Sequence, residues 1–186
     1  MSTNYDEVCD NMLLQLYERV RYVKDKSIHL SLDANQRMMI KLSWNAFVAG
    51  DPSNRGMQMF LKMFSMQPKT QSVFEFARGS SAAQMQNSTR IIFHVTRVVK
   101  YITKVVENLE SLEDMAPVLR RLGGRHGTSG YNVPTDYFPH LGVAMRELMK
   151  AHIGNWTKQH DQLWDTLYTW IVARMREGQA TYGGKR

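Results

Sequence analysis

Apolar residues recur every three or four positions along most of the chain, which is the period of an amphipathic α-helix. The most regular stretch covers residues 88–109, where the apolar stripe consists of Ile91, Val95, Val98, Ile102, Val105 and Leu109. No segment alternates apolar and polar residues between hairpin turns, and no internal repeat is visible. The pattern predicts one all-α domain of about eight helices.

Breaks in this periodicity set the expected limits of the helices. In the main domain we expect long helices over residues 33–49, 53–66, 88–109, 112–126, 135–153 and 157–177. Two helix starts have the spacing of a capping box, in which side chains and backbone amides bond reciprocally: Asp33 with Gln36, and Ser111 with Asp114. Thr135 and Thr157 are the expected caps of the last two helices.

Residues 5–27 form a separate amphipathic pattern ahead of the main domain. Acidic residues precede basic ones along it, which complements a helix dipole, and the apolar stripe is Val8, Met12, Leu16, Val20 and Val23. We expect a helix that packs on its own domain; pairing with a partner and contact with a membrane surface are the alternatives. The predicted organisation is an extension over 1–31, a domain over 32–178 and a flexible tail over 179–186.

Composition and charge bound the class of protein. A chain of 186 residues has room for one domain with a substantial core. Lys and Arg number 24 against 17 Asp and Glu, but they form no tight cluster and no nucleic-acid motif accompanies them. We expect a solvated basic surface and no nucleic acid, with an acidic protein or an anionic membrane as the alternative partners.

The N-terminal sequence and the cysteine content indicate the compartment. The first ten residues are acidic and polar, without the basic and apolar regions of a secretory signal. Cys9 is the single cysteine, so no internal disulfide forms. No stretch approaches the roughly 20 apolar residues of a membrane span. We therefore expect a cytoplasmic protein.

Two histidines are the candidate chemical groups. His94 and His126 lie on the apolar faces of their helices, 32 positions apart. A histidine there is usually a core residue, and no HExxH, CxxC or CxxCH motif indicates zinc or covalently attached haem. Neutral imidazole is nevertheless a good iron ligand, and apolar helices supply the slot that haem needs. Because no nucleophile–base motif or paired carboxylates accompany the histidines, we expect binding and not enzyme catalysis.

An ordered set of residues around these histidines resembles the globin family over residues 33–177. The set comprises Trp44, Phe60, Pro68, Phe74, His94 with Val98, the segment Leu122–His126, and Trp164 with Tyr168. Each match is weak alone, whereas their common order and spacing are specific. The separation of the two histidines and the last two aromatic residues resemble the neuroglobin-like branch. The resemblance implies a globin fold of about eight helices over the main domain, with the N-terminal helix as an addition.

The resemblance also implies a haem b site, with His126 as the proximal iron ligand and His94 as the distal histidine. Phe74 would stack against the haem, with Phe76 near its edge. The other residues implied in the pocket are Phe60, Val98, Val118, Leu122, Val133, Phe138, Tyr168 and Ile171. Arg97 and Arg125 are either partners of the haem propionates or solvent-exposed arginines.

Two iron states are open to such a site. In one, His126 alone binds the iron and His94 donates a hydrogen bond to O₂, with CO and NO as further ligands. In the other, His94 itself binds and external ligands must displace it, which suits electron transfer to an acidic partner, or gas and redox sensing. We favour this bis-histidine state because Phe60 cannot donate a hydrogen bond. The alternatives are a five-coordinate oxygen carrier or store and a haem-less globin-like interaction domain.

Glycines surround the expected proximal ligand. Gly123 and Gly124 lie inside its helix, where each glycine weakens the helix by about 0.5–1 kcal/mol relative to alanine. Two interpretations stay open: these glycines allow close packing against a neighbouring helix, or they let the ligand-bearing helix shift. The loop after His126, with Gly130 and Tyr131, is longer than in the neuroglobin-like branch.

Overall fold

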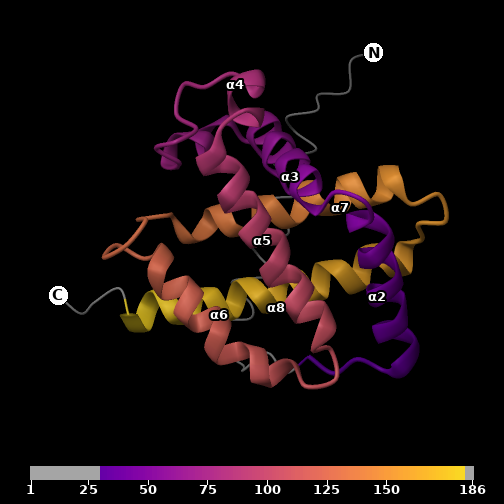
Figure 1. The fold of residues 1–186 in the computed structure, drawn as a ribbon. Helices are drawn as coiled ribbons and strands as arrows, with labels where there is room; N and C mark the ends of the chain where they lie inside the picture. The colour runs from indigo at the N-terminus through magenta and orange to yellow at the C-terminus, as the bar shows by residue number, and fades with distance from the viewer. Residues whose placement is uncertain (1–29, 183–186) are drawn as a thin grey trace, which may run out of the picture.

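The computed structural model describes residues 30–182, and it is all-α over this range (Figure 1). The expected helix over residues 5–27 and the end of the chain, 183–186, lie outside the described residues. The elements are α2 (Ala34–Val48), α3 (Pro52–Met66), η2 (Pro68–Val73), α4 (Ala82–Gln86), α5 (Thr89–Glu107), α6 (Leu112–His126), η3 (Thr135–Tyr137), α7 (Phe138–His152) and α8 (Lys158–Tyr182). Between residues 30 and 182, no helix combines the length and the apolar composition that crossing a bilayer requires.

The six long helices expected from the periodicity are all present, which confirms the all-α prediction for the described residues. The largest difference is at the end of α8, which continues to Tyr182. The prediction of a flexible tail is therefore wrong for residues 179–182. The physical reason is that the side chain of Gln179 is buried, with its amide bonded to two main-chain carbonyls.

The first predicted capping box is confirmed and the second is wrong. The Asp33 carboxylate accepts a hydrogen bond from the Gln36 amide at 2.8 Å, and the Gln36 side chain accepts one from the Asp33 amide at 3.0 Å. Ser111 precedes α6 but makes no side-chain cap. Its ψ of 52° departs from the extended conformation of a capping residue, so its carbonyl oxygen accepts the Asp114 amide instead.

The two expected threonine caps also differ. The Thr157 hydroxyl accepts a hydrogen bond from the His160 amide at 3.4 Å, and the His160 ring accepts one from the Thr157 amide at 3.2 Å. Thr157 therefore caps α8 as predicted. Thr135 lies inside the short helix η3, and Tyr137 takes the capping position of α7.

The main core lies where α2, α5 and α8 meet. Trp44 and Trp164 are fully buried, with ring centroids 5.6 Å apart. Their indole nitrogens donate to the hydroxyls of Thr103 and Ser43 at 3.0 and 2.9 Å, so burial leaves neither N–H unpaired. Burial of each large apolar side chain contributes about 1.5–3 kcal/mol to the stability of the folded state, so this cluster stabilises the packing of the three helices.

Two helix pairs, α3–α5 and α6–α8, make the most extensive helix contacts. In Figure 1, α6 runs beside the C-terminal half of α8, while α3 and α5 cross toward the top of the view. The α3–α5 contact buries a second apolar cluster that includes Phe60, Phe64 and Val95. Residues of both pairs line an interior cavity, so α3–α5 and α6–α8 form two of its walls.

Glycines bring α6 and α8 into backbone contact. A Cβ atom added at Gly123 would lie 1.9 Å from the carbonyl oxygen of Met175, and one added at Gly178 would lie 1.9 Å from that of Arg120. Real Cβ atoms do not approach so closely, so only glycine fits at either position. Of the two readings of Gly123, close packing is the one found.

Candidate functional site

A cavity of about 850 Å³ lies between the α3–α5 and α6–α8 walls. Both histidines singled out in the sequence line it, from α5 and from the last turn of α6. Its volume is within the range of about 300–1,000 Å³ of small-molecule and cofactor sites, and most of its lining is apolar.

The ring of His126 is fixed by a hydrogen bond within its own helix. Its Nδ1 lies 2.8 Å from the carbonyl oxygen of Leu122. Because a carbonyl only accepts, Nδ1 is the donor; in the neutral imidazole it carries the one N–H, and Nε2 keeps a free lone pair that can bind a metal. Phe138 and Tyr131 flank the ring with centroids 5.7 and 5.4 Å away. Burial lowers the pKa of His126, although the bond to Leu122 acts in the opposite direction.

The ring of His94 is enclosed by three phenylalanines. Phe60, Phe74 and Phe76 have ring centroids 5.4, 5.6 and 5.6 Å from it. Within residues 30–182, neither ring nitrogen has a hydrogen-bond partner. Burial first, and then the charges of His126 and Arg97, lower the pKa of His94 to about 4. His94 is therefore a neutral imidazole at neutral pH, and its electrostatic coupling to His126 agrees with their common place in the cavity.

The donor set fits haem. No group of three or more His, Cys, Asp or Glu side chains within residues 30–182 is arranged to hold a bare metal ion. Haem iron needs only axial ligands from the protein, because the porphyrin supplies the other four, and imidazole is a common one. An apolar cavity of this volume with a neutral imidazole on each of two walls meets that requirement.

Exposed arginines lie at the edge of the cavity. Arg97 and Arg125 were expected there, and Arg78 and Arg90 join them, whereas Glu75 is the acidic residue of the lining. Arg90 precedes His94 by four residues and Arg97 follows it by three, so helical spacing would have identified both. The Arg97 guanidinium lies 5.3 Å from the ring centroid of Phe93. These arginines give the cavity a cationic edge suited to carboxylates such as the haem propionates.

Most of the expected pocket residues line the same cavity. Besides the two histidines and two arginines, those found there are Phe60, Phe74, Phe76, Val98, Leu122, Val133, Phe138, Tyr168 and Ile171. Val118 does not line it; that expectation is corrected in favour of Leu119. The face of α6 toward the cavity follows Leu119, Leu122 and His126, so Val118 lies at its edge and packs on the main core.

Sequence reasoning missed several lining residues. Tyr101, Ile102 and Val105 continue the face of α5 that begins at His94, and the helical period identifies them once the cavity is known to extend along that helix. Met175 comes from a later turn of α8 than the expected Tyr168 and Ile171. The cavity is thus longer than the resemblance alone implied.

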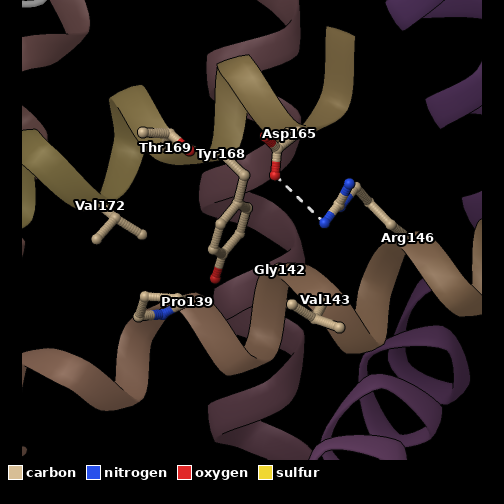
Figure 2. A pocket seen from close by; sticks show the side chains of 8 residues that line it. All are labelled: Pro139, Gly142, Val143, Arg146, Asp165, Tyr168, Thr169 and Val172. Atoms are coloured by element: carbon tan, nitrogen blue, oxygen red, sulfur yellow. Dashed lines mark ion pairs between the residues drawn. The ribbon is translucent and has the colours of Figure 1, made fainter. Parts of the chain in front are cut away.

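Tyr168 closes the cavity against α7. Its ring lies so close to Gly142 that an added Cβ atom would be 2.2 Å from it, and burial raises its pKa. Figure 2 shows the ring pointing from α8 toward α7, next to a crevice of only about 10 Å³. In the same view an ion pair of 3.2 Å joins Arg146 on α7 to Asp165 on α8. These contacts lock α7 to α8 behind the cavity.

Comparisons with known proteins agree with this arrangement. The sequence model of the globin family matches residues 57–175, more than half of the chain. Neuroglobin of Dissostichus mawsoni is 27% identical over 154 residues, which is 82% of this chain and 95% of that protein. A polymeric globin component of Glycera dibranchiata is 29% identical over 129 residues, which is 67% of this chain and 83% of that protein.

Solved structures share the fold. A hexacoordinated heme protein from an anhydrobiotic tardigrade aligns with a TM-score of 0.70 and 19% identity, covering 80% of this chain and 96% of that one. The neuroglobin of the acoel Symsagittifera roscoffensis aligns with a TM-score of 0.68 and 19% identity, covering 78% and 97%. Ferric myoglobin of Aplysia limacina gives a TM-score of 0.68 and 19% identity, covering 83% and 100%. The chain therefore has the same fold as these three proteins.

Proposed function

The chain belongs to the globin family, and from this premise we propose that it binds haem b between His126 and His94 as a bis-histidine haem protein. The observation that carries the proposal is the pair of neutral imidazoles in one cavity, of which His94 has no hydrogen-bond partner within residues 30–182. When bound, the haem supplies a one-electron redox centre and an iron that binds small gases such as O₂, CO and NO.

His126 is the proximal ligand in this proposal. Its Nδ1 donates to Leu122, which orients the ring and raises the basicity of Nε2. Phe138 and Tyr131 contact the ring and limit its rotation. Arg97 and Arg125 are positioned at the cavity edge, where they would hold the two propionates.

His94 is the second axial ligand. The three phenylalanines around it offer no donor or acceptor, and the imidazole lines the cavity, so its ring nitrogens are available to bind iron there. A gas then has to displace His94, and its observed affinity falls in proportion to the fraction of protein in which His94 has left.

The role that fits such a site is electron transfer, or gas and redox sensing, without catalysis. Besides Arg97 and Arg125, which the propionates would neutralise, the exposed Arg78 and Arg90 at the cavity edge favour an acidic protein partner, whose association they would accelerate. We also propose a cytoplasmic location for this role, because a single cysteine cannot form an internal disulfide.

The absorption spectrum of the reduced, oxygen-free protein after titration with haem tests the proposal. Two bound imidazoles predict a low-spin ferrous spectrum with split visible bands at one haem per chain. A single broad high-spin band would favour the five-coordinate oxygen carrier instead. The absence of a Soret band after titration would contradict haem binding. The haem-less globin-like interaction domain would then be the remaining hypothesis.

A further inference from the structure

Gln179 occupies the last turns of α8, past the segment 57–175 that the globin family model matches. Its side chain is only 9% exposed. The Nε2 atom donates two hydrogen bonds, one to the main-chain oxygen of His126 at 3.0 Å and one to that of Val133 at 2.9 Å. A single amide therefore joins the residue that carries the proximal imidazole to Val133, which lies two residues before η3.

The two carbonyls fix the orientation of the Gln179 amide. A flipped amide would place its oxygen against two carbonyl oxygens, so the NH₂ group must face them. The opposite atom, Oε1, is buried and has no partner among the described residues. An unpaired buried amide oxygen is unfavourable, and an apolar side chain would avoid it. The two bonds made by Nε2 are thus the favourable contribution of a glutamine at this position.

The loop between the two carbonyls folds back onto the end of α6. The Val133 amide donates to the His126 oxygen at 2.9 Å, so that oxygen accepts two hydrogen bonds. The Tyr131 amide donates to the Arg125 oxygen at 2.9 Å. Gly130 allows this approach, because an added Cβ atom there would lie 2.1 Å from the Arg125 oxygen. The backbone around the proximal ligand is therefore tied down at several points.

Close packing of α6 on α8 brings Gln179 to this place. The preceding residue, Gly178, lies against the Arg120 carbonyl, where only glycine fits. The residue before Gly178, Glu177, accepts a hydrogen bond from Arg120 at 2.7 Å. These contacts hold the C-terminal end of α8 on α6. They therefore also fix where the side-chain amide of Gln179 lies.

We propose that Gln179 is a positioning residue for the proximal iron ligand, holding the main chain of His126 so that the strength and tilt of the iron–imidazole bond are fixed. The hydrogen bond from Nδ1 to Leu122 restrains rotation of the ring, whereas Gln179 restrains translation of the backbone that carries it. This inference rests on the proposed function, because it requires His126 to bind iron.

Resonance Raman spectroscopy of the iron–histidine stretch is the direct test. The parent is His94→Ala in the ferrous state, where His126 is the one axial histidine. Gln179→Leu in that parent removes both donated bonds at similar volume, and we expect the stretch to shift to lower frequency and broaden. Thr181→Ala, an exposed change on the same helix, is the matched control and should leave the band unchanged. Gln179→Glu keeps the shape but loses the donors, and should behave like Gln179→Leu.

The possible failures are distinguishable. If the parent shows no iron–histidine stretch, the proposed function fails. If the parent shows it and Gln179→Leu leaves it unchanged, the positioning role is wrong while haem binding through His126 stands.

Hydrogen–deuterium exchange of the full chain keeps the inference testable if Gln179→Leu binds haem weakly. Exchange of the amides in residues 127–133 should rise by about tenfold, the effect of losing a restraining hydrogen bond. Exchange in α2 and α3 should not change, which shows that the variant is folded. Unchanged exchange at the Val133 amide would overturn the proposal.

Discussion

The two histidines line one cavity but are held in different ways. His126 is restrained twice, through its Nδ1 bond to Leu122 at 2.8 Å and through its main-chain bond from Gln179 at 3.0 Å. His94 is enclosed by phenylalanine rings, and within residues 30–182 it has no hydrogen bond from its ring. A hydrogen-bonded ligand keeps its place when its metal bond breaks, whereas one held by packing alone can turn away. We therefore expect His126 to retain haem and His94 to be the ligand that leaves.

The helix pairs that carry the two histidines also differ in how closely their backbones approach each other. On the His126 side, a Cβ atom at Gly123 of α6 would lie 1.9 Å from the main chain of α8. On the His94 side, a Cβ atom at Gly56 of α3 would lie 2.8 Å from the Val95 carbonyl oxygen of α5. The proximal wall is in tighter backbone contact than the distal wall, which leaves conformational adjustment to the His94 side.

The largest expected effect is a difference in haem retention between variants that lack one or the other histidine. His126→Ala should weaken haem binding by more than the roughly 10–100-fold that loss of a residue hydrogen-bonded to a metal ligand costs, because the iron loses the ligand itself. His94→Ala should retain haem. Transfer of haem to an excess of an apo-globin acceptor measures both rates. Equal loss from the two variants would remove the distinction between the histidines.

Ligand binding gives the next effect. His94→Ala should bind CO faster by roughly 10- to 1,000-fold, since a minor open state is typically populated at about 0.1–10%. Stopped-flow mixing with CO measures the rate. Ile92→Ala, at an exposed residue of the same helix that does not line the cavity, is the control and should change it little. Identical kinetics in His94→Ala and the unaltered protein would mean that His94 does not compete for the iron.

Alanine substitutions at the glycines compare the two walls directly. Gly123→Ala should lower the free energy of unfolding by about 1–3 kcal/mol or more, because the added methyl group meets backbone. Gly56→Ala should cost less, and Gly154→Ala, with nothing within 4 Å, should be nearly neutral. Urea unfolding of the three variants gives the order. If Gly56→Ala were the most destabilising, the distal wall would be the tighter one.

The smallest effect concerns the cavity edge. Arg97→Gln should speed haem loss by up to about fivefold, the limit set by an exposed ion pair of about 0.2–1 kcal/mol. Lys62→Gln, exposed on α3, is the charge-matched control. Haem transfer at low and high salt measures the effect, which should shrink as salt screens the pair. A rate equal to that of Lys62→Gln at low salt would remove Arg97 from the propionate site.

The helical period predicted the long helices and the face of α5 because these depend on local repetition. The same period could not separate Val118 from Leu119, since adjacent residues differ by about 100° around a helix and the packing of α6 on α8 decides between them. The enclosure of His94 by Phe74 and Phe76 depends on how η2 folds back, which no local pattern encodes.

Gln179 shows where sequence reasoning fails. A polar residue in a short, polar terminal stretch is expected to be solvated, so the sequence predicts that Gln179 belongs to a flexible tail. Its partners lie 53 and 46 positions earlier in the chain, so its burial follows only from the assembled α6–α8 contact. By contrast, the ordered set from Trp44 to Tyr168 identified the family, because common spacing over a whole domain is specific where single residues are not.

Electron paramagnetic resonance of the ferric, haem-loaded protein at neutral pH tests most directly whether both histidines bind the iron. Two neutral imidazole ligands predict a low-spin signal from the unaltered protein, and His94→Ala should convert it to a high-spin signal. A high-spin signal already present in the unaltered protein, unchanged by His94→Ala, would contradict the bis-histidine account.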